Sequence, residues 1–144
     1  MPQLAHHSFG MQLALLSRAW RAELDRRLAS LGLSQARWLV LLHLAMLNAP
    51  PTQRELAQSV GVEGPTLARL LDSLEALGLV NRVGVPEDRR AKKITLTDQA
   101  RPLIAQIEAI SSALRAELFA GIDDADIERC QEVHQRILAN LARI

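Results

Sequence analysis

The sequence predicts a mainly α-helical protein with one small β-hairpin. Apolar stripes that repeat every three or four residues run through most of the 144 residues, and this is the period of an amphipathic α-helix. Val83 and Val85 alternate with polar or small residues, as do Ile94 and Leu96, on either side of the turn-forming Pro86-Glu87-Asp88. The length suits a single domain over residues 1–144, because it allows a core but not two ordinary domains.

The composition narrows the class of protein. Hydrophobic residues make up 49% and charged residues 23% of the chain, which argues against disorder. Aromatic residues make up only 3% and tyrosine is absent, so a stacking platform for single-stranded nucleic acid is not expected. Because the formal net charge is only +1, attraction to a polyanion would have to come from local clusters of cations.

The sequence carries no signal for secretion or membrane insertion. Its first ten residues lack the basic start and apolar stretch of a secretory signal. The apolar run from Trp38 to Leu47 is interrupted by His43 and is too short to cross a bilayer. A single cysteine excludes an intramolecular disulfide. We therefore expect a soluble cytoplasmic protein without a membrane partner.

The first two predicted helices differ in their apolar faces. The first should end near Gly32, and its single stripe comprises Phe9, Leu13, Leu16, Trp20, Leu24, Leu28 and Leu31. The second follows a possible cap at Ser34 and is apolar nearly all round, which places it at the centre of a bundle. Asn48-Ala49-Pro50-Pro51 should end it.

Two shorter helices should follow, joined by a glycine turn. Thr52 and Glu55 form a capping box for a helix over 53–59, in which Thr52 bonds the amide of Glu55 and Glu55 reaches back to the amide of Thr52. Pro65 suits the first turn of the next helix, which Gly78 should end. The expected inward residues are Leu56, Ala57, Val60, Leu67, Leu70, Leu71, Leu74 and Leu77. This arrangement is a helix-turn-helix.

The hairpin that follows is strongly basic. Residues 80–97 contain both lysines of the protein, and their five cations, opposed only by Glu87 and Asp88, are Arg82, Arg89, Arg90, Lys92 and Lys93. A helix-turn-helix followed at once by such a hairpin predicts a winged helix-turn-helix, with residues 33–97 as the DNA-binding core. Double-stranded DNA is therefore the expected partner.

Residues 8–32 and 98–144 should form long dimerisation helices. Thr97 caps the fifth helix, Pro102 predicts an irregular start, and Gly121 separates this helix from a last one that begins at Asp123. Their stripes comprise Leu103, Ile107, Ile110, Leu114 and Leu118, then Ile127, Cys130, His134, Ile137, Leu141 and Ile144. Apolar stripes that the core cannot cover predict a homodimer, which would read half-sites about 34–36 Å apart.

The chain resembles the MarR family of bacterial transcription regulators. EDRRAKKITLT matches the family's Asp-x-Arg wing signature, and GLSQARWLVL, VEGPTLARLLDSLEALGLVNR, EDRRAKKITLTDQARPLI and RAELFAGI are closer to its SlyA branch. The resemblance covers essentially the whole chain. It implies a dimer that binds pseudo-palindromic promoter DNA and is often released by small aromatic carboxylates such as salicylate. Val85 departs from the family, where many relatives carry Asp before the proline, which leaves the loop's shape open.

The resemblance also implies roles for individual residues. Pro65, Thr66 and Arg69 fall on the recognition helix that enters the major groove. Asp88 and Arg90 fall on the wing motif with Arg89 between them, and the two arginines would reach the minor groove.

Side-chain chemistry favours the same residues. Arginine forks suit a narrow minor groove, with Asp88 bracing one of them by hydrogen bonds, and a solvated charged loop is the alternative. Arg69 would contact a guanine edge or a phosphate, or else pair with Asp72 or Ser73. The residues expected to contact or position the DNA backbone are Gln53, Arg54, Lys92 and Lys93.

A ligand site is a separate prediction. Trp20, Trp38 and His43, with Arg18 or Arg21, could form an apolar pocket with one cation, suited to an aromatic carboxylate. Two core tryptophans and surface arginines are an equally good interpretation.

The sequence predicts neither a cofactor nor a metal site, and no enzyme activity. Cys130 and His134 have a metal-compatible spacing but lie on an apolar stripe, which favours packing in the core or an interface. No P-loop, nucleophile elbow or paired-carboxylate pattern is present in the sequence. The alternatives to a sequence-specific regulator are an architectural DNA-binding protein of low specificity and a helical module that binds another protein.

Overall fold

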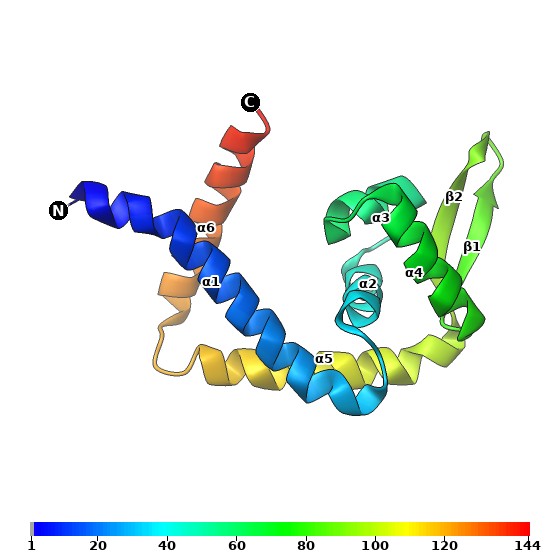
Figure 1. Ribbon diagram of the computed structural model, residues 1–144, viewed down its shortest axis with the longest axis horizontal. Helices are drawn as coiled ribbons and strands as arrows, with labels where there is room; N and C mark the ends of the chain where they lie inside the picture. Colours follow the sequence, from blue (N-terminus) through cyan, green and yellow to red (C-terminus); the bar gives the residue numbers. More distant parts are fainter. Residues whose placement is uncertain (1) are drawn as a thin grey trace. The chain divides into compact units, whose positions relative to one another are not determined.

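The computed structural model describes the backbone from residue 2 to 144 and the side chains from Ser8 onward (Figure 1). The helices, strands and 3-10 turns (η) are α1 (Pro2–Leu28), η1 (Ala29–Leu31), α2 (Gln35–Met46), α3 (Gln53–Val60), α4 (Gly64–Ala76), β1 (Val80–Val85), β2 (Asp88–Leu96), η2 (Asp98–Ala100), α5 (Arg101–Leu118) and α6 (Asp124–Leu141). The mainly α fold with one antiparallel hairpin is confirmed. The chain forms two compact units, one ending at Ser112 and one starting at Ala113.

Helix α2 lies at the centre of the first unit. Its Trp38, Val40, Leu41 and Leu44 are all buried, as expected for a helix that is apolar nearly all round. The indole Nε1 of Trp38 donates a hydrogen bond to Asp25 Oδ1 at 3.1 Å, which links α2 to α1. The rest of this core includes Leu24, Leu28, Leu56, Leu67, Leu71, Leu74, Val80, Ile94, Ile104 and Ile107.

The helix-turn-helix forms largely as predicted. Thr52 Oγ1 accepts the amide of Glu55 at 3.1 Å, but the box closes differently from the prediction: the Thr52 hydroxyl lies 3.0 Å from Glu55 Oε1 and donates to it. Gly61 adopts φ +82° after α3, a conformation that glycine reaches without a Cβ clash. Leu77 was predicted to be inward, which is wrong: it is 49% exposed, because α4 ends at Ala76.

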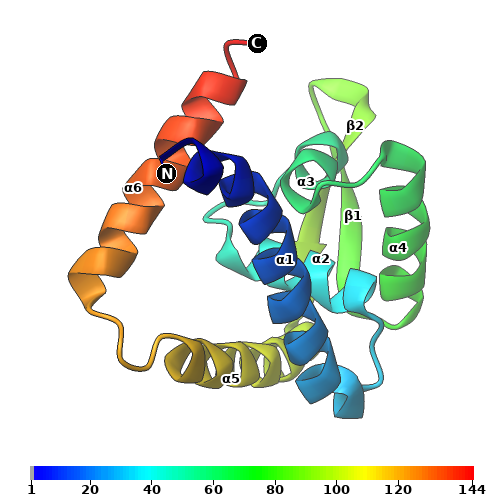
Figure 2. The same ribbon diagram turned by 60° about the vertical axis from the view of Figure 1, so that its left-hand side comes forward.

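The hairpin lies alongside α4 (Figures 1 and 2). Its turn is Pro86-Glu87, and Asp88 already belongs to β2 rather than to the loop as predicted. The amide of Ile94 donates to Pro51 O at 2.9 Å, and Thr52 forms a bridge with Lys93. The root of the hairpin is therefore joined to the segment that leads into α3.

The long outer helices leave much apolar surface exposed. Thr97 caps η2, its Oγ1 lying 3.3 Å from the amide of Ala100, so the predicted irregular start of α5 is confirmed. Phe9, Leu13 and Leu16 of α1 are exposed, and the exposed apolar residues after α5 include Ile122, Val133, Leu138, Leu141 and Ile144.

Of the two expectations for Cys130 and His134, packing in the core or in an interface, the structure excludes the core of the described chain. Both residues are exposed, and α6 has no buried residue among those described. Packing against another copy of the chain stays a prediction.

One further property concerns the helices as a set. Among the described residues, no single helix is long and apolar enough to span a bilayer. Residues 8–31 and α2 meet such a criterion only as a pair, and this pair is bent by 94°.

Candidate nucleic-acid interface

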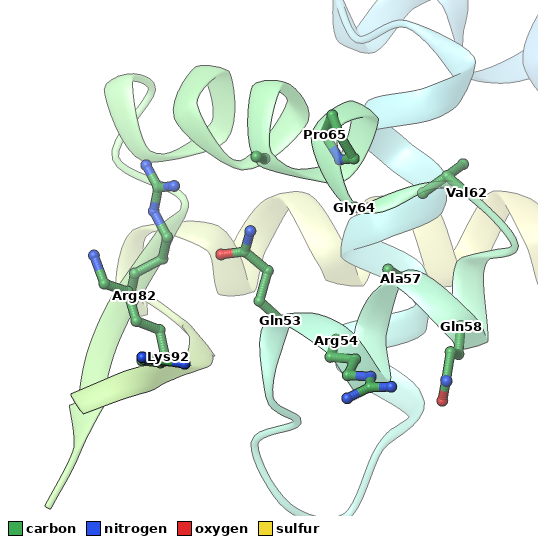
Figure 3. A pocket seen from close by; sticks show the side chains of 11 residues that line it. Gln53, Arg54, Ala57, Gln58, Val62, Gly64, Pro65, Arg82 and Lys92 are labelled. Carbon is green, nitrogen blue, oxygen red and sulfur yellow. The ribbon is translucent and has the colours of Figure 1, made fainter. Parts of the chain in front are cut away.

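Helices α3 and α4 and the hairpin enclose an open groove of about 750 Å³ (Figure 3). It is lined by Gln53, Arg54, Ala57, Gln58, Val62, Gly64, Pro65, Ala68, Arg82, Arg90 and Lys92. One cavity is thus shared by the start of α3, the start of α4 and the hairpin β1–β2, which we call the wing. From the sequence alone, these three parts were considered separately.

Helix α3 contributes polar side chains to the groove. Figure 3 shows Gln53 projecting from the start of the helix into the space between Pro65 and Arg82. Arg54 and Gln58 are exposed and extend from the same helix. Since Gln58 follows Arg54 by four residues, both lie on one face of α3.

Helix α4 contributes backbone and small side chains. Gly64 and Pro65 form its first turn, and Ala68 follows one turn later. The first amides of a helix have no partner within the helix and carry partial positive charge, so they favour phosphate. Thr66 and Arg69 do not line this groove, and Arg69 is exposed.

The wing presents Arg90 through an irregular strand. Val85 pairs with Asp88 and Gly84 pairs with Lys92, so the segment from Arg89 to Ala91 forms a bulge in β2. Asp88 Oδ1 accepts a hydrogen bond from the backbone amide of Arg90 at 2.9 Å. The carboxylate therefore holds the backbone of the bulge, not a guanidinium as the sequence had suggested.

A smaller cavity of about 350 Å³ adjoins this bulge. It is lined by Thr52, Gln53, Arg54, Asp88, Arg90, Ala91 and Lys92. Arg54, Arg90 and Lys92 therefore border both cavities, which concentrates three cations where a polyanion would lie.

The remaining wing cations lie elsewhere. Alternation along β2 places Lys92 on the sheet face of the buried Ile94 and Lys93 on the opposite face. Arg89 is exposed and lines neither cavity.

Arg82 differs from the other wing cations because two carboxylates of α4 bind it. Its Nη2 lies 2.5 Å from Asp72 Oδ1 and 3.2 Å from Glu75 Oε1. The partner of Asp72 is thus Arg82, not Arg69 as one interpretation of the sequence had proposed. The guanidinium also lowers the pKa of Glu75 below its usual 4.5, mainly through their hydrogen bond.

This pKa shift predicts how acid affects stability. Because the pKa of Glu75 is lower in the folded chain, its ion pair stabilises the fold above pH 4.5, and this contribution is lost as pH falls through the lowered value. We expect urea unfolding to show a Glu75→Gln variant less stable than the original chain at pH 7, with the difference closing below pH 4.5. A difference that stays constant with pH would contradict the assignment.

Sequence reasoning missed several groove residues. Ala57, Gln58, Val62, Gly64 and Ala68 lie beside predicted contacts but carry no charge, so no chemical signal selected them. Helical spacing from Arg54 and Pro65 could have found Gln58 and Ala68.

The predicted ligand residues lie on α1 and α2. Trp38 is only 1% exposed, Trp20 and His43 are half-buried, and Arg18 and Arg21 are exposed. His43 Nδ1 lies 2.9 Å from Ser59 Oγ of α3. Burial, aided by the charge of Arg21, lowers the pKa of His43 below 6.5, so its ring is neutral at pH 7.

The helix-turn-helix, the hairpin and the groove between them define a winged helix-turn-helix protein of the DNA-binding class. A model of the MarR family matches residues 31–91. The solved structure of the transcriptional regulator PA3341 is 66% identical, with a TM-score of 0.89 over 94% of this chain and 99% of that one. The chain belongs to the MarR family of DNA-binding transcriptional regulators.

More distant relatives share the whole fold. CouR from Rhodococcus jostii RHA1, solved with p-coumaroyl-CoA bound, is 28% identical, with a TM-score of 0.78 over 89% of this chain and 90% of that one. A MarR-family regulator from Rhodococcus sp. RHA1 is 26% identical, with a TM-score of 0.80 over 92% and 93%.

Proposed function

We propose that this chain is a homodimeric regulator of the SlyA-like branch that binds pseudo-palindromic promoter sites. The main support is the groove, in which Arg54, Arg90 and Lys92 surround the N-terminal end of α4. Pro65 and Thr66 would approach the major groove with that helix end, and Arg69 would follow one turn later. Arg89 and Arg90 would enter the minor groove, and Lys93 would neutralise phosphate.

The homodimer is supported by the exposed apolar residues of the outer helices. Residues 8–32 and 98–144 supply the dimerisation helices in this proposal, and residues 33–97 supply the DNA-binding core. Leu15 and Leu16 of α1 are 63% and 58% exposed, which is unfavourable for a helix that remains alone in water. A two-fold dimer presents two grooves, so its DNA site would carry two half-sites about one helical turn apart.

Selection of bound duplexes from random DNA tests this function. We expect the recovered sites to share a two-fold related motif and to bind more than about 1,000-fold tighter than random duplex. An architectural protein would show a similar salt dependence without that gap in affinity. No measurable affinity at low salt would instead favour a module that binds a protein.

We also propose that a small aromatic carboxylate weakens DNA binding. The carboxylate would pair with Arg18 or Arg21, beside Trp20 and the neutral His43. Because Trp38 is almost fully buried, it would line the site only after α1 and α2 separate slightly. CouR was solved with p-coumaroyl-CoA bound, which supports an aromatic ligand, whereas the free carboxylate is proposed from Arg18 and Arg21 alone.

Titration of salicylate into a complex with the selected duplex tests the ligand. We expect salicylate, but not benzyl alcohol, to reduce binding, because only salicylate carries the carboxylate. In an Arg21→Ala variant the response should weaken while DNA affinity without ligand is retained. An unchanged complex at millimolar salicylate would exclude this ligand.

A further inference from the structure

Arg82 belongs to the basic wing but has different surroundings from the other cations. Its side chain is only 18% exposed, although it lies at the border of the groove. The strand period places Arg82 on the same face as Val80, which is fully buried. That face of β1 is directed toward α4. Arg82 follows Val80 on this face and therefore lies next to the helix.

The partners of Arg82 lie on one face of α4. Asp72 and Glu75 are three residues apart, and this spacing brings two side chains together on a helix surface. Arg82 Nη2 contacts a carboxylate oxygen of each, and its Nε lies 3.5 Å from Glu75 Oε2. The planar guanidinium can hold both carboxylates at once, which a single ammonium group does less well.

The charge of this cluster argues against a phosphate contact. One cation between two carboxylates leaves a net charge of −1, so a phosphate would be repelled rather than bound. Arg54, Arg90 and Lys92 line the same groove, and within the described part of the chain none of them forms an ion pair. Arg82 is therefore poorly suited to be a fourth DNA contact.

The geometry instead indicates how the wing is oriented. The Pro51–Ile94 and Thr52–Lys93 contacts hold the hairpin partway along β2, and its tip, which carries Arg90, projects past the helices (Figure 1). The position of Arg90 relative to Pro65 depends on the angle between the hairpin and α4. Two ion pairs from one strand residue to one helix restrict that angle.

We infer that Arg82 is a positioning residue, which holds the wing against the recognition helix α4 through Asp72 and Glu75 and does not itself bind DNA. The inference rests on the proposed function, since it concerns how two parts of that DNA interface are held together. It assigns the carboxylates of α4 a role in DNA binding despite their negative charge.

The direction in which DNA affinity changes when both carboxylates are removed distinguishes a positioning role from a simple effect of charge. An Asp72→Ala/Glu75→Ala variant removes two negative charges from the partners of Arg82, which lines the groove, so electrostatics alone predicts tighter DNA binding. Loss of the wing's orientation predicts weaker binding. Both residues are exposed, and alanine is the best helix former, so α4 should stay folded.

The experiment measures affinity for the selected duplex by fluorescence anisotropy over a range of salt concentrations. For Asp72→Ala/Glu75→Ala and for Arg82→Ala, we expect about three- to tenfold weaker binding, with the salt dependence of the original chain retained because no phosphate contact is lost. The triple variant should bind no more weakly than Arg82→Ala, since both remove the same contact. Arg82→Lys should recover part of the affinity.

Glu63→Gln is the matched control for charge. Glu63 precedes α4 and makes no side-chain capping bond with its described amides, so its neutralisation should leave binding equal or slightly tighter. Thermal unfolding checks that each variant is folded. If Arg82→Ala unfolds, the change in DNA affinity of the Asp72→Ala/Glu75→Ala variant tests the inference by itself.

Unchanged or tighter binding by Asp72→Ala/Glu75→Ala would overturn the inference. So would a smaller salt dependence in Arg82→Ala, which identifies a phosphate contact. If the original chain selects no duplex at all, it is the proposed function that fails.

Discussion

An Arg90→Ala variant is expected to bind promoter DNA about 10- to 100-fold more weakly than the original chain, the loss typical of one well-placed arginine contact. Arg90 borders both cavities, and the hydrogen bond from its amide to Asp88 holds the backbone from which its side chain projects. Because that bond is made by the backbone, the alanine variant retains it and should keep its melting temperature.

Arg101→Ala is the matched control for this prediction. Arg101 is 80% exposed, and its Nε lies 3.1 Å from Asp98 Oδ1, so the variant removes the same charge from outside the groove. Fluorescence anisotropy at matched salt compares the two variants. Equal affinity of Arg90→Ala and the original chain would exclude Arg90 as a DNA contact. Arg89→Ala should have the smaller effect, because Arg89 lines neither cavity.

A Leu16→Glu variant is expected to convert the dimer into a monomer. Leu16 lies on the predicted stripe of α1 and is 58% exposed in the single chain. A carboxylate buried at a subunit interface would lack a compensating partner, which opposes association. Without the second subunit, binding of the two half-sites is no longer linked, and DNA affinity should fall by more than about 100-fold.

Analytical ultracentrifugation at micromolar concentration, together with DNA binding, measures this effect. Ser30→Glu adds the same charge at an exposed position of η1 and serves as the control. A stable Leu16→Glu dimer would show that this stripe does not form the interface. A monomer that retains full DNA affinity would show that dimerisation is not needed for binding.

Periodicity and turn chemistry were good predictors of the fold. The helix boundaries follow from local signals, such as the left-handed conformation at Gly61 and the Thr52 cap, which act within a few residues. The errors occurred at the end of α4 and on the exposed surface of α6. Leu77 is exposed because it lies past the last turn of α4. Cys130 is exposed on α6, which has no buried residue among those described.

The candidate site was only partly predictable. Charge, spacing and the family resemblance selected ten DNA-contact residues. Those that line the groove are Gln53, Arg54, Pro65, Arg90 and Lys92, whereas Thr66, Arg69, Asp88, Arg89 and Lys93 do not. Small or neutral groove residues such as Gly64 and Ala68 have no charge that would mark them as DNA contacts in the sequence. Arg82 has such a charge and lies in a basic stretch, but its ion pairs with Asp72 and Glu75 are visible only in the structure.

By itself the sequence determined the fold class, the order of the elements and the concentration of charge in the wing, because these depend on short-range periodicity and composition. Only the tertiary structure decided which cations face the groove and which are paired. Asp72 and Glu75 reach Arg82 because α4 packs on β1, and Asp88 turns to the amide of Arg90 because β2 bulges there. These pairings depend on where the strand register and helix packing bring the side chains, not on charge or spacing along the chain.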